Sequence, residues 1–460
     1  MSRSRILAAM LSTGIENDEA RPTEAPEVDE NGNPIATDTP AEAEPVVEIA
    51  EDTEAAAVAE VAEGADEVAE VVDVVEELNE ASEGLESLYI DIAAARIDGG
   101  LSAQAFRGYS AAIESYTNRV GMTIATPAVE SFGGATSRIH ATASLESGVL
   151  DKIKEFIKKI IEAIKAAFRK VGDWFRKVVL GAERLAKRAE SLKEKSKGMK
   201  GSAALEINGK WVTNNKKQVT VGEAADELGH TVMILSEYTV LLSDAAKGLS
   251  DKAATIAGQA AGSAKEDADK AAASALKDMS SAVSKIGLKP VTDGSGDEVV
   301  LAGSDLVGGK RLEIRYNKSA TAAALGTFQA NLATAPNFKP AEKVKISVSA
   351  ADVAAIADRV AQGAKSAGEF DADFRKRDAA LKEIGSKLDS AANASLKDQS
   401  TWSAEDKAAV SALIRNSIRP LQCLPTIATG TIAHAMAGFS GLLDIAAKAV
   451  SEGSKEKKAD

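Results

Sequence analysis

Lysine is missing from the first 151 residues of this 460-residue chain and first occurs at Lys152. Residues 1–146 contain 30 acidic residues against 7 basic ones, a net charge of −23. The whole chain has 69 acidic and 55 basic residues, which leaves 39 and 48, or +9, for residues 147–460. An acidic leader is therefore joined to a basic body, and this asymmetry favours a charged partner.

Composition and periodicity predict a mainly α fold. Aromatic residues make up only 4% of the chain, and alanine, which buries little area, is abundant, so we expect long, thinly packed helices. The predicted order is a disordered acidic leader (1–71), a helical hairpin with a cleavage loop (72–146), a basic amphipathic helix (147–200), a helical region with one or two small β-hairpins (201–345), and a C-terminal helical region (346–460).

The leader is predicted to be disordered because it has too little apolar surface to offset its chain entropy. Residues 15–71 are rich in Glu, Asp, Ala, Pro and Thr and contain no aromatic residue. Two interpretations stay open at this point. The segment is either a solubilising tail, or an acidic mimic that keeps the basic body away from nucleic acid.

Helical periodicity returns at residues 72–97 and ends at Gly99-Gly100. Ser102 is then expected to cap a second helix, roughly 103–120, so that the two form a hairpin. The Thr-, Ser- and Ala-rich stretch that follows, up to Glu146, predicts a loop. Small residues on an exposed loop suit a protease, which binds its substrate as an extended chain.

One run of residues here carries a resemblance to a known family. Pro127-Ala-Val-Glu130-Ser131-Phe132-Gly133-Gly134, followed by Ser137-Arg138 and Ala141-Thr-Ala-Ser144-Leu145-Glu146, resembles the end of the propeptide in internal head proteins of giant, phiKZ-like tailed bacteriophages. The resemblance covers roughly residues 75–147 well and the rest by composition. An ordinary interdomain linker is the alternative interpretation of this stretch.

The resemblance implies proteolytic maturation inside a prohead. In that family a prohead protease cuts after a glutamate that has a small residue two positions before it. Residues Ser144, Leu145, Glu146 and Ser147 match this pattern, and Ala128, Glu130 and Ser131 form an alternative site. The implied protein is a structural virion protein of the capsid interior, assembled in the host cytoplasm, with the prohead protease and other capsid or prohead core proteins as partners.

The first segment after the predicted cut is a basic amphipathic helix. Between Ile153 and Val171 the apolar residues follow the helical period, and cations lie between and beyond them. The basic face could simply be solvated while the helix packs on its own core, or it could contact DNA phosphates, or the helix 149–179 could lie on an anionic membrane surface. The candidate contact residues are Lys152, Lys158, Lys159, Lys165, Arg169, Lys170, Arg176 and Lys177.

Further along the chain, two short stretches change from helical to strand-like periodicity. Asn208-Gly209 predicts a tight turn of a hairpin over 204–220, and residues 297–316 predict two strands around a Gly-rich turn. Residues 318–335 are expected to be helical. Ser349 and Ser403 are expected to cap two of the later helices.

No motif in the chain points to catalysis, a cofactor or a metal. The three histidines are far apart, there is one cysteine, Cys423, and neither G-x-S-x-G nor H-E-x-x-H occurs. The favoured hypothesis is a non-enzymatic internal head protein whose basic body is packaged with DNA. The alternative is a membrane-active or host-directed protein ejected with the genome, and a weaker one is an enzyme whose site forms only in the fold.

Overall fold

The computed structural model describes residues 50–122, 135–214, 217–259, 263–291, 296–336, 338–340, 342–396 and 402–455. Its helices are α2 (Ala50–Ile97), α3 (Ala103–Arg119), α4 (Ala135–Ser196), α5 (Val221–Ala257), α6 (Ala264–Lys285), α7 (Ala350–Ser395), α8 (Ala404–Asn416), α9 (Arg419–Gln422) and α10 (Leu424–Lys455). The predicted mainly α fold with small β elements is confirmed. Residues 1–49, most of the predicted leader, lie outside the described residues.

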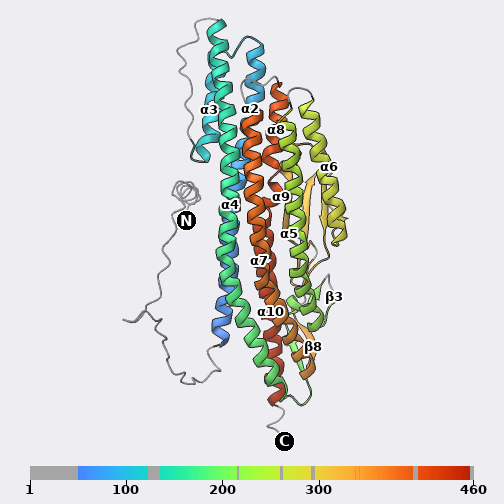
Figure 1. The fold of residues 1–460 in the computed structure, drawn as a ribbon. Helices are drawn as coiled ribbons and strands as arrows, with labels where there is room; N and C mark the ends of the chain where they lie inside the picture. Colours follow the sequence, from blue (N-terminus) through green and yellow to red (C-terminus); the bar gives the residue numbers. More distant parts are fainter. Residues whose placement is uncertain are drawn as a thin grey trace, which may run out of the picture.

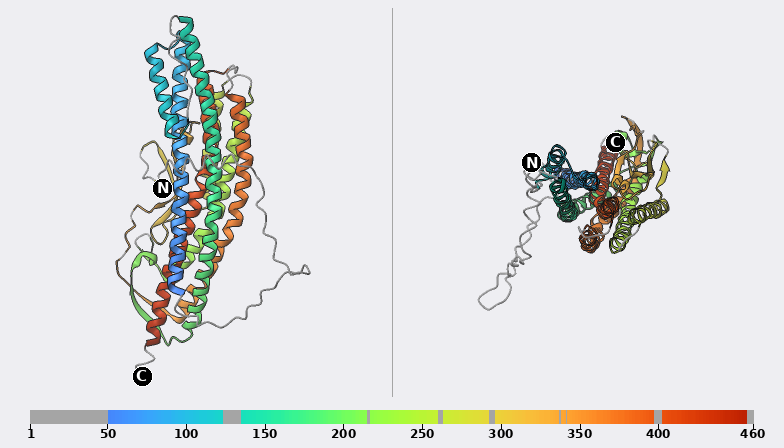
Figure 2. Two further views of the ribbon diagram at one scale, coloured as in Figure 1. Left: turned by 90° about the vertical axis from the view of Figure 1, so that its left-hand side faces the viewer. Right: turned by 90° about the horizontal axis from the view of Figure 1, so that it is seen from above.

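Long helices lie side by side along most of the molecule (Figure 1). Helix α4 packs between α2 and α7, α7 packs on α5, and α6 flanks α5. Helix α10 contacts α2, α4, α5 and α7, and so closes the core between them. Figure 2 shows α3 folded back beside the end of α2, and shows α2 and α4 running alongside each other.

Helix α2 includes residues 55–71, so their predicted disorder is wrong. The reason is a seven-residue repeat in which the buried residues are alternately four and three positions apart. This spacing places them in one continuous stripe along the helix, which we call the seam. Because Ala, Val and Gly occupy most of these positions, the composition looked too weakly apolar for a core. The buried positions are Ala57, Val61, Gly64, Val68, Val71, Val75, Leu78, Ser82, Leu85, Tyr89 and Ile92.

Helix α3 begins as predicted, since the Ser102 hydroxyl accepts a hydrogen bond from the Ala105 amide at 3.2 Å. The turn before it needs Gly99 and Gly100, whose φ angles are +98° and +86°. Gly100 also lies so close to the Arg138 backbone that a Cβ would come within 2.7 Å of it. The start of α4 is thereby held against the end of α2.

The predicted loop up to Glu146 is wrong for residues 135–146, which form the first turns of α4. Ala141, Leu145 and Val149 are spaced by four and are buried, so the helical period extends back into the Thr/Ser/Ala-rich stretch. The Thr142 hydroxyl donates to the Arg138 carbonyl and accepts from the Leu101 amide, both at 2.8 Å. The predicted boundary at 146/147 therefore lies inside one continuous helix.

The strands are β1 (Ser202–Ile207), β2 (Thr213–Asn214), β3 (Lys217–Gln218), β4 (Lys289–Val291), β5 (Glu298–Ala302), β6 (Lys310–Asn317), β7 (Gln329–Thr334) and β8 (Val344–Ser349), with 3₁₀ turns η2 (Gly209–Val212) and η3 (Ala324–Thr327). Strands β4-β5-β6-β7 form an antiparallel sheet, while β1 pairs with β8 and β2 with β3. The predicted hairpin over 297–316 corresponds to β5 and β6, with Gly308 and Gly309 at positive φ between them.

Two predictions about the strand regions are wrong. Strand β1 pairs with distant β8 rather than with residues 210–213, because Asn208 caps the 3₁₀ turn η2 through its side chain instead of turning a hairpin (Lys210 N to Asn208 Oδ1 2.9 Å). Residues 318–335 were expected to be helical, yet β7 pairs with β6 along its whole length. Buried Ala330 and half-buried Leu332 are two residues apart and so lie on one face of this strand.

Aromatic side chains join α4 to α7 in the middle of the bundle. Phe168 stacks on Phe374 with ring centroids 4.8 Å apart, and the ring of Phe175 lies 5.9 Å from those of both Phe370 and Phe374.

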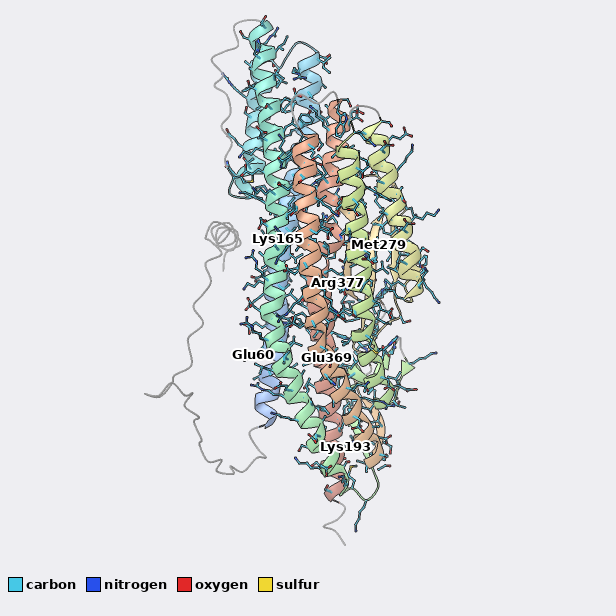
Figure 3. The ribbon with its side chains drawn as sticks, in the orientation of Figure 1. Glu60, Lys165, Lys193, Met279, Glu369 and Arg377 are labelled. Carbon is cyan, nitrogen blue, oxygen red and sulfur yellow. The ribbon has the colours of Figure 1, made fainter. Side chains whose placement is uncertain are left out.

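The predicted helix caps at Ser349 and Ser403 are confirmed. Ser349 begins α7 with a capping box, and the Ser403 hydroxyl accepts a hydrogen bond from the Asp406 amide. Lys165 on α4, and Glu369 and Arg377 on α7, mark neighbouring helices in Figure 3.

Candidate functional site

An acidic helix and a basic helix lie beside each other over most of their length. Helix α2 contains 15 acidic residues and one basic residue, and α4 contains 15 basic and 8 acidic residues, so their net charges are −14 and +7. The buried apolar faces of the two helices lie between most of these charges. Among the described contacts, Glu67 and Lys170 approach to 3.8 Å, and Arg96 and Glu146 to 3.0 Å.

The apolar face of the predicted basic helix is buried inside the bundle. Ile153, Phe156, Phe168 and Trp174 are each 3% exposed or less. The membrane-surface interpretation requires this face at the surface, so the described fold does not support it. Within the described residues, no helix is long and apolar enough to span a bilayer.

The candidate cations lie on the opposite, solvent-facing side of α4. Lys158, Arg169, Lys170 and Arg176 are exposed, and the other four predicted contact residues are partly buried. Several are paired with acidic residues nearby. These ion pairs include Lys152–Glu155 (2.6 Å), Lys159–Glu155 (3.8 Å), Lys165–Glu162 (2.8 Å), Lys170–Glu67 (3.8 Å) and Arg176–Asp173 (3.5 Å). Their contact with DNA stays a prediction.

The predicted cleavage residues are in a helix rather than on a loop. Ser144 is exposed and Ser147 is half-buried, but Leu145 is buried and Glu146 is only 4% exposed. The alternative site, Ala128, Glu130 and Ser131, lies outside the described residues. A protease that binds an extended chain could reach the bond after Glu146 only once the first turns of α4 have unwound.

Sequence reasoning missed a buried polar cluster between α2 and α8. The Arg415 guanidinium contacts both carboxylate oxygens of Glu86, at 3.2 and 3.0 Å, and the Ser411 hydroxyl donates to the same carboxylate at 2.8 Å. The side chains of Arg415 and Glu86 are 1% and 8% exposed. These residues are far apart in the sequence, and an arginine in a short helix resembles any surface arginine, so no local signal could have identified the pair.

A second, partly buried pair lies two to three turns away along α2. Arg419 Nη1 is 2.5 Å from Glu76 Oε1, and Gln422 donates to the same oxygen at 2.9 Å. Gln422 in turn accepts from the Asn79 side chain at 3.0 Å. Helices α8 and α9 thus bind the acidic helix through two guanidinium groups.

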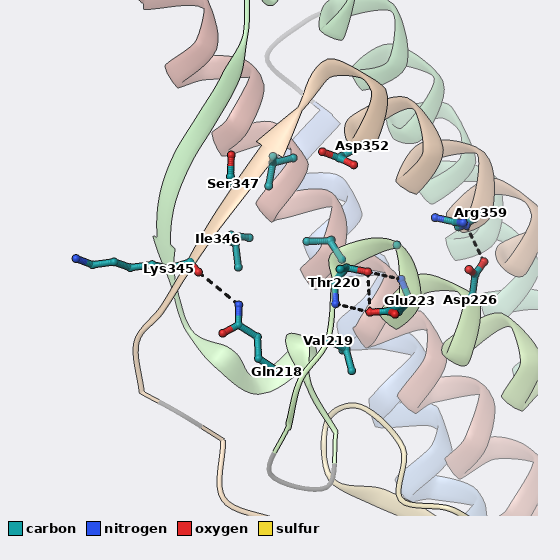
Figure 4. Close-up of a pocket in the computed structure, with 13 residues that line it drawn as sticks. Gln218, Val219, Thr220, Glu223, Asp226, Lys345, Ile346, Ser347, Asp352 and Arg359 are labelled. Atoms are coloured by element: carbon teal, nitrogen blue, oxygen red, sulfur yellow. Dashed lines mark hydrogen bonds and ion pairs between the residues drawn. The ribbon is translucent and has the colours of Figure 1, made fainter.

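A groove of about 530 Å³ lies where α5 and α7 begin, beside β1 and β8 (Figure 4). Both helix N-termini face it, but each is already closed by a capping box, formed by Thr220 with Glu223 on α5 and by Ser349 with Asp352 on α7. Arg359 pairs with Asp226 at 2.6 Å. The carboxylates of Glu223, Asp352 and Asp226 are therefore already engaged by these caps and this ion pair.

Burial shifts the pKa values of the Cys423 thiol and the His434 imidazole, and so lowers the reactivity of both side chains. Loss of hydration raises the pKa of the Cys423 thiol to about 11, so the thiolate is scarce at neutral pH. The pKa of His434 is lowered to about 4, first by burial and then by the positive charges of Lys310 and Lys210. Its Nε2 lies 2.8 Å from the Val307 carbonyl, and its ring packs on Trp211.

His434 should make the protein less stable in mild acid. The unfolded histidine takes up a proton near pH 6.5, whereas the folded one does so only near pH 4, so protons favour the unfolded state between these values. We expect the loss, fully developed below pH 4, to reach about 3 kcal/mol. Urea denaturation at pH 7, 5.5 and 4.5 should show a flatter pH dependence for His434→Gln. The exposed His230→Gln should keep the wild-type slope, and equal slopes for all three proteins would contradict the assignment.

Comparison with known proteins identifies a family for this chain. The sequence model of the phiKZ-like phage internal head proteins matches residues 41–443, which is most of the chain. No curated protein and no solved structure matches the chain. The matched segment spans the acidic helix α2, the basic helix α4 and the start of the C-terminal helix α10. The chain therefore belongs to the phiKZ-like phage internal head proteins, structural proteins that lie inside the virion head.

Proposed function

We propose that this internal head protein is made as a precursor that a prohead protease cuts after Glu146, and that the basic body 147–460 is packaged with DNA. The observation that carries the proposal is the acidic helix α2 held against the basic helix α4. In the precursor the net charge is −14. Loss of residues 1–146 would leave +9, a charge that favours contact with packaged phosphate.

The start of α4 is where the cut would have to occur. Residues 135–146 form the end of a 62-residue helix, and helix ends open more readily than helix centres. Unwinding them would break the Arg96–Glu146 ion pair and the hydrogen bond from Leu101 to Thr142. It would leave the contacts between the middle of α2 and the bundle intact. Cutting is expected in the host cytoplasm, during prohead assembly.

Recovery of the protein from mature particles tests the cut. We expect its N-terminal sequence to begin at Ser147, and we expect Glu146→Ala to block processing there. Glu162→Ala is the matched control, because Glu162 is an exposed glutamate of the same helix with Ile160, not a small residue, two positions before it. A start at Ser131 would move the boundary to Glu130. A full-length chain in mature particles would rule out the maturation proposal.

DNA retention by the particle-derived protein tests the role of the basic face. Binding to phosphate releases counterions, so affinity should fall steeply with added salt and should not depend on DNA sequence. Replacing Lys158, Arg169 and Arg176 with glutamine should reduce the slope of log affinity against log salt by about 3. Replacing Lys277, Lys285 and Lys289, exposed cations of α6 and β4, should change it little. Retention that is insensitive to salt would contradict the electrostatic contact.

A further inference from the structure

We propose that α4, α8 and α9 form a docking surface for the acidic helix α2, and that this surface keeps α2 bound after the chain between them has been cut. The inference rests on the proposed maturation. It adds that cutting and release of the acidic segment are separate events. The occupant of the surface is the segment 50–97 of this same chain.

The first support is the continuity of the apolar contact between α2 and α4. The seven-residue repeat of α2 is buried from Ala57 to Ile92, about 50 Å of helix at 1.5 Å per residue. At its N-terminal half, the Trp174 indole donates to the Val61 carbonyl at 2.7 Å. Gly64 makes this approach possible, because a Cβ there would lie 2.5 Å from the indole ring. This contact is remote from the predicted cut.

The second support is the pair of guanidinium groups that α2 covers. Arg415 has both oxygens of Glu86 as partners and also contacts the Asn79 carbonyl at 3.4 Å, while Arg419 binds Glu76. Departure of α2 would break these charge-assisted hydrogen bonds together with the apolar contacts that shield them from water. Because charge-assisted hydrogen bonds are roughly twice as strong as neutral ones, α2 should leave slowly.

The third support is the kind of helix that this surface can bind. It presents an apolar strip and two cations at fixed positions, and so it fits an amphipathic helix with carboxylates beside its apolar seam. Helix α2 has Glu76 and Glu86 at the required places, and these contacts do not depend on the chain connection at residues 123–146. Cutting removes the tether, which lowers the effective concentration of α2, but it removes none of these contacts.

An engineered cut in the otherwise intact chain tests the proposal. A recognition sequence for a site-specific protease is inserted between Met122 and Ala135, the folded protein is cut, and the product is passed over a size-exclusion column in 0.1 M and in 1 M NaCl. We expect both pieces to elute together in both buffers, because buried contacts are screened little by salt. Separation of the pieces in either buffer would overturn the proposal.

Variants then test whether the guanidinium groups act as the anchor. In the cut protein, Arg415→Met should weaken retention of the N-terminal piece by about 100-fold or more. Arg415→Met combined with Glu86→Met should restore it, a rescue that general misfolding would not give. Lys170→Met, which removes the exposed pair with Glu67, should leave retention within about fivefold. Equal weakening in the single and double Met variants would overturn the anchoring role.

The outcome of this experiment is independent of the outcome of the maturation experiment. The engineered cut uses an added protease, so its result does not depend on which bond the prohead protease cleaves. A full-length chain in mature particles would remove the proposed processing and leave the docking measurement unchanged. Immediate separation after the engineered cut would instead leave processing possible and show that cutting alone frees the acidic segment.

Discussion

Replacing Arg415 with methionine in the intact protein should lower the free energy of unfolding by about 3–5 kcal/mol. Methionine leaves the Glu86 carboxylate buried without its cation, and Ser411 alone cannot compensate for that charge. Urea denaturation at pH 7 measures the change. The fluorescence of Trp174, Trp211 and Trp402 reports unfolding, and none of these residues belongs to the cluster.

The control for this prediction removes both charges. Arg415→Met with Glu86→Met should be close to the wild-type protein in stability or above it, because an apolar pair of similar volume often replaces a buried ion pair without loss. Lys170→Met breaks an exposed pair and should change the free energy by less than about 1 kcal/mol. A single Arg415→Met variant within 1 kcal/mol of wild type would mean that water reaches the pair in solution.

Truncation of Phe439 to alanine should lower the free energy of unfolding by about 3–5 kcal/mol. Phe439 is fully buried on α10, and its ring lies directly against the backbone of Gly363 on α7. Because the helix–helix contact is so close, the cavity left by the ring cannot easily be filled by its neighbours. Thermal and urea denaturation measure the loss.

The same contact predicts an unusual effect at the glycine. Gly363→Ala should destabilise by about 1–3 kcal/mol, because its methyl group would overlap the Phe439 ring. Glycine to alanine in an open helical position should do the opposite, and Gly172 on α4 has open space around it, so Gly172→Ala should stabilise by about 0.5–1 kcal/mol. Stabilisation by both substitutions would show that α7 and α10 are further apart than described.

Helices with strong local signals could be predicted from the sequence. Ser102, Ser349 and Ser403 cap the expected helices, and Gly99-Gly100 ends the one before α3. Helix α4 from residue 149 onwards was also evident, because large apolar residues repeat with the helical period. In each case the information lies within a few residues of the element.

Helical segments whose buried face consists mainly of small residues were not predicted from the sequence. Composition made residues 50–71 look disordered, although Ala57, Val61 and Gly64 already begin the repeat that continues to Ile92. A test for steps of four and three in Ala, Val and Gly would have found it. The start of α4 was missed for the same reason, since the buried residues among 136–144 are the small Ala141 and Thr142.

The candidate site was only partly accessible to sequence reasoning. The division of charge between the two ends of the chain was plain, and so was the basic face of α4. The contact of Glu86 with Arg415 was not, because 329 residues separate them. Strand β1 illustrates the same limit, since its partner β8 is chosen by tertiary packing and not by the nearby Asn-Gly pair.

The long sequence distance between α2 and its partners has a consequence during synthesis. Gln422, which contacts Asn79, is 343 residues further along the chain. At about 5–20 residues per second, a ribosome needs roughly 20–70 s to add them. For that time α2 exists without α8, α9 and α10, and its repeat has only earlier-made helices to cover it. Translation of the C-terminal helices is therefore the step that completes the bundle, and chains that stop before them would leave the acidic helix only partly covered.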